Sequence, residues 1–366
     1  MQPLLMRHIR IFIAALVTAA AISSCADRRT GESFRLYGCG WPSEASEGYS
    51  KGVSAPFCGV YDGKFVTAGG ANFPETPAAE GGQKRYYSDI HVFNGERWMK
   101  AGELPFPLAY GGSFTIDGEM LTAGGNNGSG TVADVFRIVQ LGGGLMALPS
   151  TPLPTPVEQA GYASDGDTIY IAGGLSAEGV SEKVLAGKVS DAGIEWKEIA
   201  GMPERLVQPV AFAAEGCLYV WGGFDPVEKR VSTKGWRLDL NSCKWDEVGE
   251  GPDGETFAGA SAAVLDDGRA VVVGGVDKDV FTHGLSATGD EKTAYMTMSP
   301  EEYRFNRKIR IFDPSEGKWS SAGEADALAL AGAGTATDGT ATYITGGEIK
   351  PGIRTTGTWK LEIPVK

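Results

Sequence analysis

The chain of 366 residues contains little histidine, little cysteine and no excess of basic charge. Its three histidines are His8, His91 and His283, too few for a copper centre built from several imidazole ligands. No Cys-x-x-Cys pair and no P-loop glycine pattern occurs, so the sequence offers neither a zinc-ribbon nor a nucleotide-phosphate motif. We therefore predict no metal and no cofactor.

Positive charge is also scarce, because 33 Lys and Arg residues stand against 46 Asp and Glu residues. The net charge of −13 leaves no basic footprint for nucleic acid, which we do not expect as a partner. An anionic ligand of such a chain needs a local cluster of basic side chains.

One long apolar run is present, at residues 11–22, directly after Arg7 and Arg10. It is too short for a stable membrane span and predicts an export signal over residues 1–24. The run ends at Ile22-Ser23-Ser24-Cys25, which resembles a bacterial lipobox and predicts a lipid on Cys25. The alternative is an ordinary cleaved signal. We expect an exported, lipid-anchored protein of the bacterial envelope, with a short tether over 25–32 and acyl chains as its only anchor.

Four cysteines remain after Cys25, an even number in an oxidising compartment. Cys217 and Cys243 flank neighbouring strands of one repeat, so we favour a Cys217–Cys243 disulfide, and less strongly a Cys39–Cys58 disulfide. The alternative is that these four thiols stay free.

The main internal signal is a repeat, because an apolar β-rich run that ends in Gly-Gly recurs six times. The intervals between the double glycines are 55, 49, 49, 52 and 72 residues, and the first four approach the kelch period of about 50 residues. The double glycines lie at 69–70, 124–125, 173–174, 222–223, 274–275 and 346–347.

Each run is preceded by an acidic residue and a glycine, a pair that suits a two-residue hairpin. A further strand downstream leads into a turn and a tryptophan, as at Trp98, Trp245 and Trp319, which we expect to pack between blades. The repeat therefore predicts four antiparallel strands, one blade of an all-β, six-bladed kelch-type propeller over residues 33–366.

The sixth repeat has no room for a fourth strand after residues 358–363. We expect the stretch 33–37, which precedes the first repeat, to supply that outer strand. Pairing of the first and last segments then closes the ring and removes an exposed sheet edge.

Two features depart from the regular pattern. The long fifth interval contains a charged insertion at 277–307, which we expect to be partly helical and to cover the channel; the alternative is a solvated decoration. The sixth double glycine leads into Glu348, Lys350 and Arg354 around a Pro-Gly turn. A carboxylate there can transfer protons, and a guanidinium can grip a carboxylate through two hydrogen bonds. The alternative is a surface ion pair.

The string Gly-Glu-Ile-Lys-Pro-Gly-Ile-Arg-Thr (347–355) resembles the signature of the bacterial kelch-type N-acetylneuraminate epimerase (sialic acid mutarotase) family. The segments 68–73, 87–91, 108–111, 274–281 and 301–306 are similar too, so the resemblance covers essentially the whole mature chain. The repeat with Ala-Gly-Gly-Ala-Asn-Phe comes first here, which resembles a cyclically permuted branch of the family.

The resemblance implies an isomerase that interconverts the α and β anomers of N-acetylneuraminate without a cofactor. It implies that Glu348 transfers protons while Arg354 binds the carboxylate of the sugar. Five polar residues near matched motifs are further candidates for substrate binding: Asn72, Lys84, Tyr110, Arg205 and Asn306.

Two other function classes compete with this interpretation. A six-bladed sialidase would need Ser-x-Asp-x-Gly-x-Thr-Trp boxes, and the nearest string, at 190–196, has the wrong spacing. A non-catalytic kelch module that binds a glycan or a protein at the envelope is the main alternative, since fold does not fix function.

Overall fold

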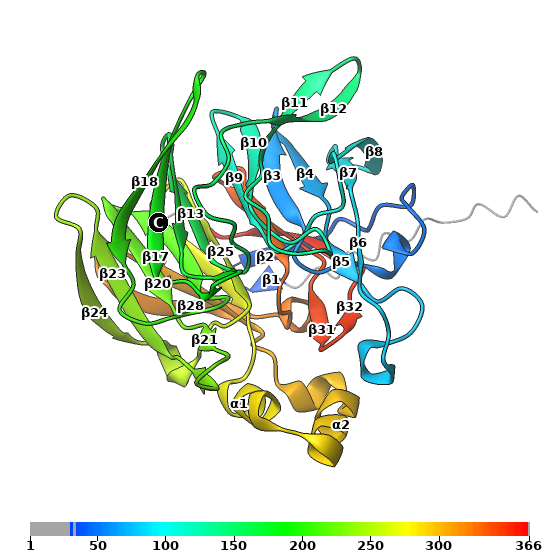
Figure 1. Cartoon of the computed structure of the whole chain (residues 1–366), viewed down its shortest axis with the longest axis vertical. Coiled ribbons are helices and arrows are strands. Elements are labelled where there is room, and N and C mark those ends of the chain that lie inside the picture. Colours follow the sequence, from blue (N-terminus) through cyan, green and yellow to red (C-terminus); the bar gives the residue numbers. More distant parts are fainter. Residues whose placement is uncertain (1–29, 32–33, 365–366) are drawn as a thin grey trace, which may run out of the picture.

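A computed structural model describes residues 30–31 and 34–364 of the chain. The predicted signal peptide, the lipid site at Cys25 and most of the tether lie outside these residues, so those predictions stay untested. Within the described residues, most ordered segments are strands, and they form separate antiparallel sheets (Figure 1). No helix in the described part of the chain is long and apolar enough to cross a membrane.

Six of these sheets are the blades of the propeller. The first three contain β3 (Phe57–Tyr61), β4 (Lys64–Ala68), β7 (Asp89–Phe93) and β8 (Trp98–Glu103); β9 (Gly112–Ile116), β10 (Glu119–Ala123), β11 (Val135–Leu141) and β12 (Gly144–Pro149); and β13 (Gly161–Asp165), β14 (Thr168–Ala172), β17 (Lys183–Ser190) and β18 (Gly193–Gly201).

The other three contain β19 (Val210–Ala214), β20 (Cys217–Trp221), β23 (Lys234–Asp239) and β24 (Lys244–Glu250); β25 (Ala260–Val264), β26 (Ala270–Gly274), β27 (Lys308–Asp313) and β28 (Lys318–Glu324); and β29 (Gly334–Thr337), β30 (Ala341–Thr345) and β33 (Thr358–Glu362) with β2 (Phe34–Gly38) and β1 (Thr30–Gly31). The predicted six-bladed fold is confirmed.

The first strands of the blades surround the axis, and each contacts the first strand of the next blade. Just before each of these strands, a residue donates its backbone N–H to the carbonyl of the residue at the same position in the preceding blade, at 2.7–3.1 Å. The six residues are Ala55, Tyr110, Gln159, Gln208, Gly259 and Gly332, all with positive φ. A closed circle of six hydrogen bonds therefore fixes the mouth of the central channel.

The ring closes as the sequence predicts, because β2 pairs antiparallel with β33. Arg35 lies opposite Glu362 in this register. Phe34 and Leu36 are buried with Leu361 and Ile363 in one apolar cluster. The alternation of these apolar residues along β2 therefore pins the first segment of the chain to the last blade. Part of the expected tether is also in the sheet, since β1 pairs with β2.

Local sequence explains the turns and the contacts between blades. In the turn after β3, both Asp62 and Gly63 have positive φ, the backbone of a tight hairpin that favours Asp-Gly. The indole of Trp98 donates to the carbonyl of Cys39 in the sixth blade, at 2.9 Å. That of Trp245 donates to the carbonyl of Gly201 in the third blade, at 2.7 Å. The expectation that tryptophans pack between blades is confirmed.

Short hairpins follow the double glycines and lie at the end of the propeller where the hydrogen-bonded circle lies. They are β5 (Ala71–Asn72) with β6 (Arg85–Tyr86), β15 (Leu175–Ser176) with β16 (Gly179–Val180), β21 (Phe224–Asp225) with β22 (Arg230–Val231), and β31 (Glu348–Lys350) with β32 (Ile353–Arg354). The 3-10 turns are η1 (Tyr49–Lys51), η2 (Ala78–Glu80), η3 (Pro252–Gly254) and η5 (Asp326–Leu328).

The insertion of the fifth blade is partly helical, as expected. It contains α1 (Lys278–Ser286), α2 (Gly289–Thr297) and the 3-10 turn η4 (Pro300–Tyr303). Asp277 caps α1 by accepting hydrogen bonds from the N–H groups of Asp279 and Val280. The insertion contacts β22, η2 and β31, and Figure 1 shows α1 and α2 beneath the β31–β32 hairpin. It therefore reaches from the fifth blade to the hairpins of the fourth, first and sixth blades.

Neither expected disulfide is present, because Cys39, Cys58, Cys217 and Cys243 are all free thiols in the structure. Cys217 lies opposite Asp239 in the β20–β23 register and packs in a buried aromatic cluster. Cys243 lies beyond the end of β23 and is exposed. Cys58 is buried, where burial raises the pKa of its thiol to about 12. Both expected disulfides are therefore absent from the structure, although Cys39 and Cys58 pack in one cluster.

Candidate functional site

The β31–β32 hairpin presents Glu348 and Arg354 directly opposite each other. Gly346 and Gly347, both with positive φ, lead into it. A Cβ on Gly346 would lie 2.3 Å from the carbonyl oxygen of Val53, so only glycine permits this approach of two backbones. Pro351 and Gly352 make the turn. The local sequence thus delivers the carboxylate and the guanidinium as a cross-strand pair, as predicted.

Arg354 is held from several sides. Its Nη2 lies 2.9 Å from the Oε1 of Glu348, and its Nε donates to the carbonyl of Ala71 at 3.2 Å. Its Cζ lies 5.0 Å from the centroid of the Phe73 ring, a cation–π contact. The side chain is only 2% exposed, and among the described residues its Nη1 has no hydrogen-bond partner. A buried, unpaired donor is costly unless a ligand or water satisfies it.

Glu348 is part-buried, with 25% of its side chain exposed. Burial raises the pKa of its carboxyl above the ordinary value, and the charges of Arg354 and Lys84 and a backbone hydrogen bond from Gly352 oppose this rise. Burial is the largest of these effects, so the group is poised to exchange a proton closer to neutral pH than an exposed carboxyl.

Lys84 and Tyr110 add a cation and a phenol near Glu348 and Arg354. Lys84 Nζ donates to the phenol oxygen of Tyr110 at 2.9 Å and lies 5.8 Å from the centroid of the Phe73 ring. Tyr86 stacks edge-on against Tyr110, with ring centroids 6.1 Å apart. Burial raises the pKa of Tyr86, with Tyr110 and Glu158 adding to the rise and Arg354 opposing it. Residues of the first, second and sixth blades therefore share one polar site.

The insertion of the fifth blade adds an aromatic wall. Tyr295 and Tyr303 are buried and stack edge-on, with centroids 5.3 Å apart. Burial raises the pKa of both phenols, and the charge of Glu348 adds to each rise. Lys350 Nζ donates to the carbonyl of Met298 at 2.7 Å, which ties the insertion to the hairpin that carries Glu348. These contacts favour the expectation that the insertion covers the mouth of the channel.

Two of the expected binding residues have other partners. Asn72 is buried; its amide donates to the carbonyls of Gly48 and Gly52, and its oxygen accepts from Tyr87. It therefore fixes the loop beneath Arg354 rather than facing a ligand. Arg205 pairs with Glu182 and Asp225 at 3.6 and 3.9 Å, beside the hairpin of the fourth blade. No described contact joins it to Glu348.

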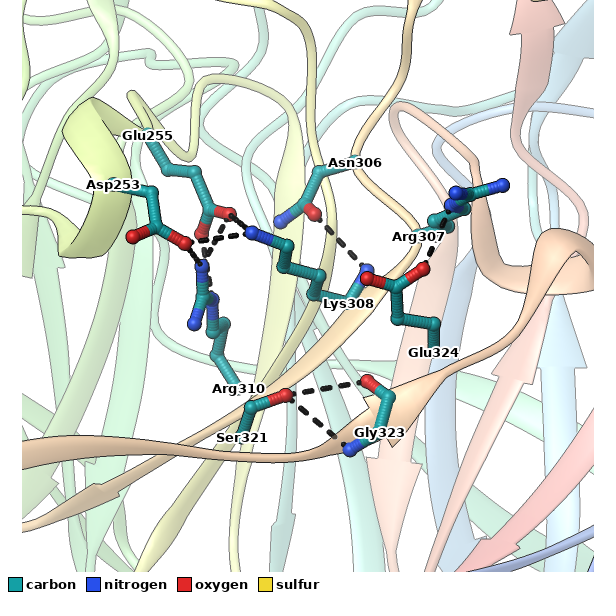
Figure 2. Close-up of polar contacts among 9 residues, drawn as sticks. All are labelled: Asp253, Glu255, Asn306, Arg307, Lys308, Arg310, Ser321, Gly323 and Glu324. Atoms are coloured by element: carbon teal, nitrogen blue, oxygen red, sulfur yellow. Dashed lines mark hydrogen bonds and ion pairs between the residues drawn. The ribbon is translucent and has the colours of Figure 1, made fainter. Parts of the chain in front are cut away.

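Asn306 lies just before β27, where the insertion rejoins the fifth blade (Figure 2). Its oxygen accepts from the backbone N–H of Lys308 at 3.0 Å, and its own backbone N–H donates to the carbonyl of Gly275. Its Nδ2 is buried with no partner among the described residues. Asn306 also lines a cavity with Ile349, the neighbour of Glu348 in sequence. Its role in binding a ligand stays a prediction.

The site also contains residues that the sequence-based candidates omitted: Phe73, Tyr86, Tyr295 and Tyr303. Phe73 directly follows Asn72 in the matched Ala-Gly-Gly-Ala-Asn-Phe string, so that string carried a signal for it. Tyr303 lies in the matched segment 301–306, which therefore also carried a signal, whereas Tyr86 and Tyr295 lie in no matched segment. Only their proximity to Glu348, Arg354 or Tyr110 singles them out.

Comparison with known proteins places this geometry in a family. The model of the N-acetylneuraminate epimerase family matches residues 150–366, more than half of the chain and including the Glu348–Arg354 hairpin. The chain belongs to this family. The predicted resemblance is confirmed.

Individual members of the family show the same relation. The N-acetylneuraminate epimerase of Yersinia pestis (strain Pestoides F) is 30% identical over 239 residues, 59% of each chain. That of Haemophilus influenzae (strain 86-028NP) is 32% identical over 222 residues, 56% of this chain and 57% of the relative. The solved structure of YjhT has a TM-score of 0.51 and 28% identity, covering 60% of this chain and 64% of YjhT. The match thus spans about three fifths of the curated relatives.

Proposed function

We propose that this protein interconverts the α and β anomers of N-acetylneuraminate by acid–base opening and closing of the sugar ring. The observation that carries the proposal is the pairing of Glu348 with Arg354 at 2.9 Å in a partly buried site. Family membership and the names of the relatives support the substrate.

The charges of the site suit an acidic sugar. Lys84 and Arg354 bring two cations to one carboxylate in a chain whose net charge is −13. With Nε on a carbonyl and Nη2 on Glu348, the unpaired Nη1 of Arg354 is the donor left for an incoming carboxylate. A charge-assisted hydrogen bond to a buried guanidinium orients the ligand as well as binding it.

Glu348 then acts as the proton acceptor. Its carboxylate removes the proton of the anomeric hydroxyl while an acid protonates the ring oxygen, so the ring opens to a ketone. After rotation presents the other face of the carbonyl, the same groups run in reverse and the ring closes. General acid–base catalysis of this kind contributes about 10²–10⁴-fold in rate.

NMR of freshly dissolved β-anomer tests the proposal. We expect the natural protein to speed equilibration of the anomers and Glu348→Gln to lose about 10²-fold or more of that rate. Arg354→Ala should weaken binding of the sugar. Failure of the natural protein to exceed the Glu348→Gln variant contradicts the proposal. Ligand-induced shifts without faster equilibration would instead favour a glycan-binding module.

We also propose that the chain is exported and lipid-anchored in the bacterial envelope. The basic, apolar and lipobox-like segments up to Cys25 support this proposal. Labelling of cells with radioactive palmitate should mark the natural chain and leave Cys25→Ser unlabelled. Equal labelling of both chains contradicts it.

The permuted order of repeats is a further part of the proposal. An alignment that keeps chain order can match only part of a chain whose closure point has moved, and the observed matches span 56–60% of this chain. Only the closure point changes in such a permutation, so the Glu348–Arg354 hairpin stays intact.

A further inference from the structure

Ring opening needs an acid for the ring oxygen besides the base for the anomeric hydroxyl, and Glu348 fills only one of these roles. The other group must lie across the ligand from Glu348 and be able to return its proton. Resting on the proposed function, we propose that Tyr110, polarised by Lys84, is this second proton-transfer group.

The hydrogen bond between the two residues sets the direction of the proton. Lys84 Nζ is the donor and the phenol oxygen of Tyr110 the acceptor, at 2.9 Å. An ammonium has no lone pair with which to accept, so the phenol proton of Tyr110 points to some other acceptor. Lys84 also lies 4.7 Å from the centroid of the Tyr110 ring. Its charge stabilises the phenolate that forms when that proton leaves.

Lys84 and Tyr110 lie near the groups proposed to bind the sugar. Lys84 Nζ and Arg354 Cζ both lie within 6 Å of the Phe73 ring centroid, at 5.8 and 5.0 Å. The charge of Lys84 also reaches Glu348, whose carboxyl pKa it lowers. Lys84 is exposed and Tyr110 half-buried, so a ligand can reach both. A sugar carboxylate on Arg354 thus lies in one site with Glu348 and the Lys84–Tyr110 pair.

The backbone of Tyr110 is held on both sides by hydrogen bonds. Its φ is +67°, a left-handed conformation that the five equivalent residues of the circle share. Its N–H donates to Ala55, and its carbonyl accepts from the N–H of Gln159 and the hydroxyl of Tyr162. Tyr110 is thus a member of the six-bond circle and one of the residues that line the central cavity of about 190 Å³. Such rigid support suits a group that must hold one proton in place.

The proton balance closes over one turnover. In opening, the anomeric proton passes to the Glu348 carboxylate, the bond between the anomeric carbon and the ring oxygen breaks, and the Tyr110 proton passes to that oxygen. In closing, the Tyr110 phenolate takes that proton back while Glu348 returns its own to the new anomeric oxygen. No cofactor, oxidant or net proton is consumed.

The test measures anomer equilibration and sugar binding for Tyr110→Phe, which keeps the ring and removes only the hydroxyl. We expect a rate loss of about 10²-fold or more, with affinity for the sugar little changed. Lys84→Met should lower the rate less, since the phenol proton remains. Tyr61→Phe is the matched control, because its hydroxyl, which accepts from the N–H of Gln140, lies beside the Asp62–Gly63 turn, away from the site.

Three results are informative. An unchanged rate in Tyr110→Phe overturns the assignment. A parallel loss of rate and affinity also overturns it, because Tyr110 would then bind the sugar without transferring a proton. Absence of acceleration by the natural protein is a different outcome, since it removes the proposed function itself.

Discussion

At the scale of the residue, Glu348 combines burial with two neighbouring cations. Burial raises the pKa of its carboxyl above the ordinary value, while the positive charges of Arg354 and Lys84 lower it. A base must be ionised to accept a proton, so its working range begins above its own pKa.

We predict that the rate of anomer equilibration falls as the pH falls through the raised pKa of Glu348. The protonated carboxyl cannot accept the anomeric proton, so the acid arm should lie at higher pH than that of an ordinary carboxyl. Lys84→Met should move this arm to still higher pH, since it removes a charge that lowers the pKa. The pH–rate profile of each variant measures this.

Lys64→Met is the control for that shift. Lys64 pairs with Asp62 at 3.5 Å beside the turn after β3, with 49% of its side chain exposed. Its removal also takes one positive charge from the chain, but far from Glu348. An equal displacement of the acid arm in both lysine variants would contradict a local effect.

At the scale of the element, β27 is joined to η3 by a cluster of charged side chains (Figure 2). Arg310 is only 8% exposed and contacts Glu255 Oε2 through Nε at 2.9 Å and Oε1 through Nη2 at 2.6 Å. Its Nη2 and Lys308 Nζ also lie 2.6 Å from Asp253, and both cations lower the pKa of Asp253 to about 2. This cluster joins the segment between the fourth and fifth blades to the strand that follows the insertion.

We predict that Glu255→Gln lowers the free energy of unfolding by about 2 kcal/mol, because it leaves the buried charge of Arg310 with a weaker partner. Urea unfolding measures the loss. The control is Asp246→Asn, which breaks an exposed pair with Arg237, 59% and 41% exposed, and should cost less than about 1 kcal/mol. Equal losses of unfolding free energy in the two variants would contradict the prediction that the buried ion pair contributes more than the exposed one.

At the scale of the whole molecule, closure pairs an outer strand from the start of the chain with a third strand from its end. The β11–β12 hairpin holds the same two positions in the second blade, and its turn, Gly142–Gly143, is exposed. The fold should therefore tolerate a chain break in either of these two strand pairs, provided that the strands still pair.

We predict that a permutant cut between Gly142 and Gly143, with residue 364 joined to Phe34 by a short linker, keeps both its melting temperature and its activity. Phe34 and the chain end lie close together, because Arg35 pairs with Glu362. The control is cut between Pro351 and Gly352, which should fold but lose activity, since it opens the hairpin that sets Glu348 opposite Arg354. Calorimetry measures the melting temperature of each permutant, and the anomer assay measures its activity. An unfolded first permutant would contradict the prediction.

Much of this architecture was readable from local sequence. The six double glycines and the acidic-Gly turns indicated the number of blades, and the lack of a fourth strand after residues 358–363 indicated how the ring closes. Glu348 and Arg354 were readable as a pair because one short hairpin holds both. The disulfides were misjudged, and Asn72 proved to support a loop, because side-chain direction depends on packing between blades.

Contacts within one hairpin or one repeat follow from the amino-acid sequence, since hydrogen-bond register and turn geometry are local. Which distant residues meet depends on how the blades pack around the axis. Closure of the ring sets Lys84 and Tyr110 of the first two blades beside a hairpin more than two hundred residues later. No local pattern encodes such a contact, because it arises from the rotation of each blade about a common axis.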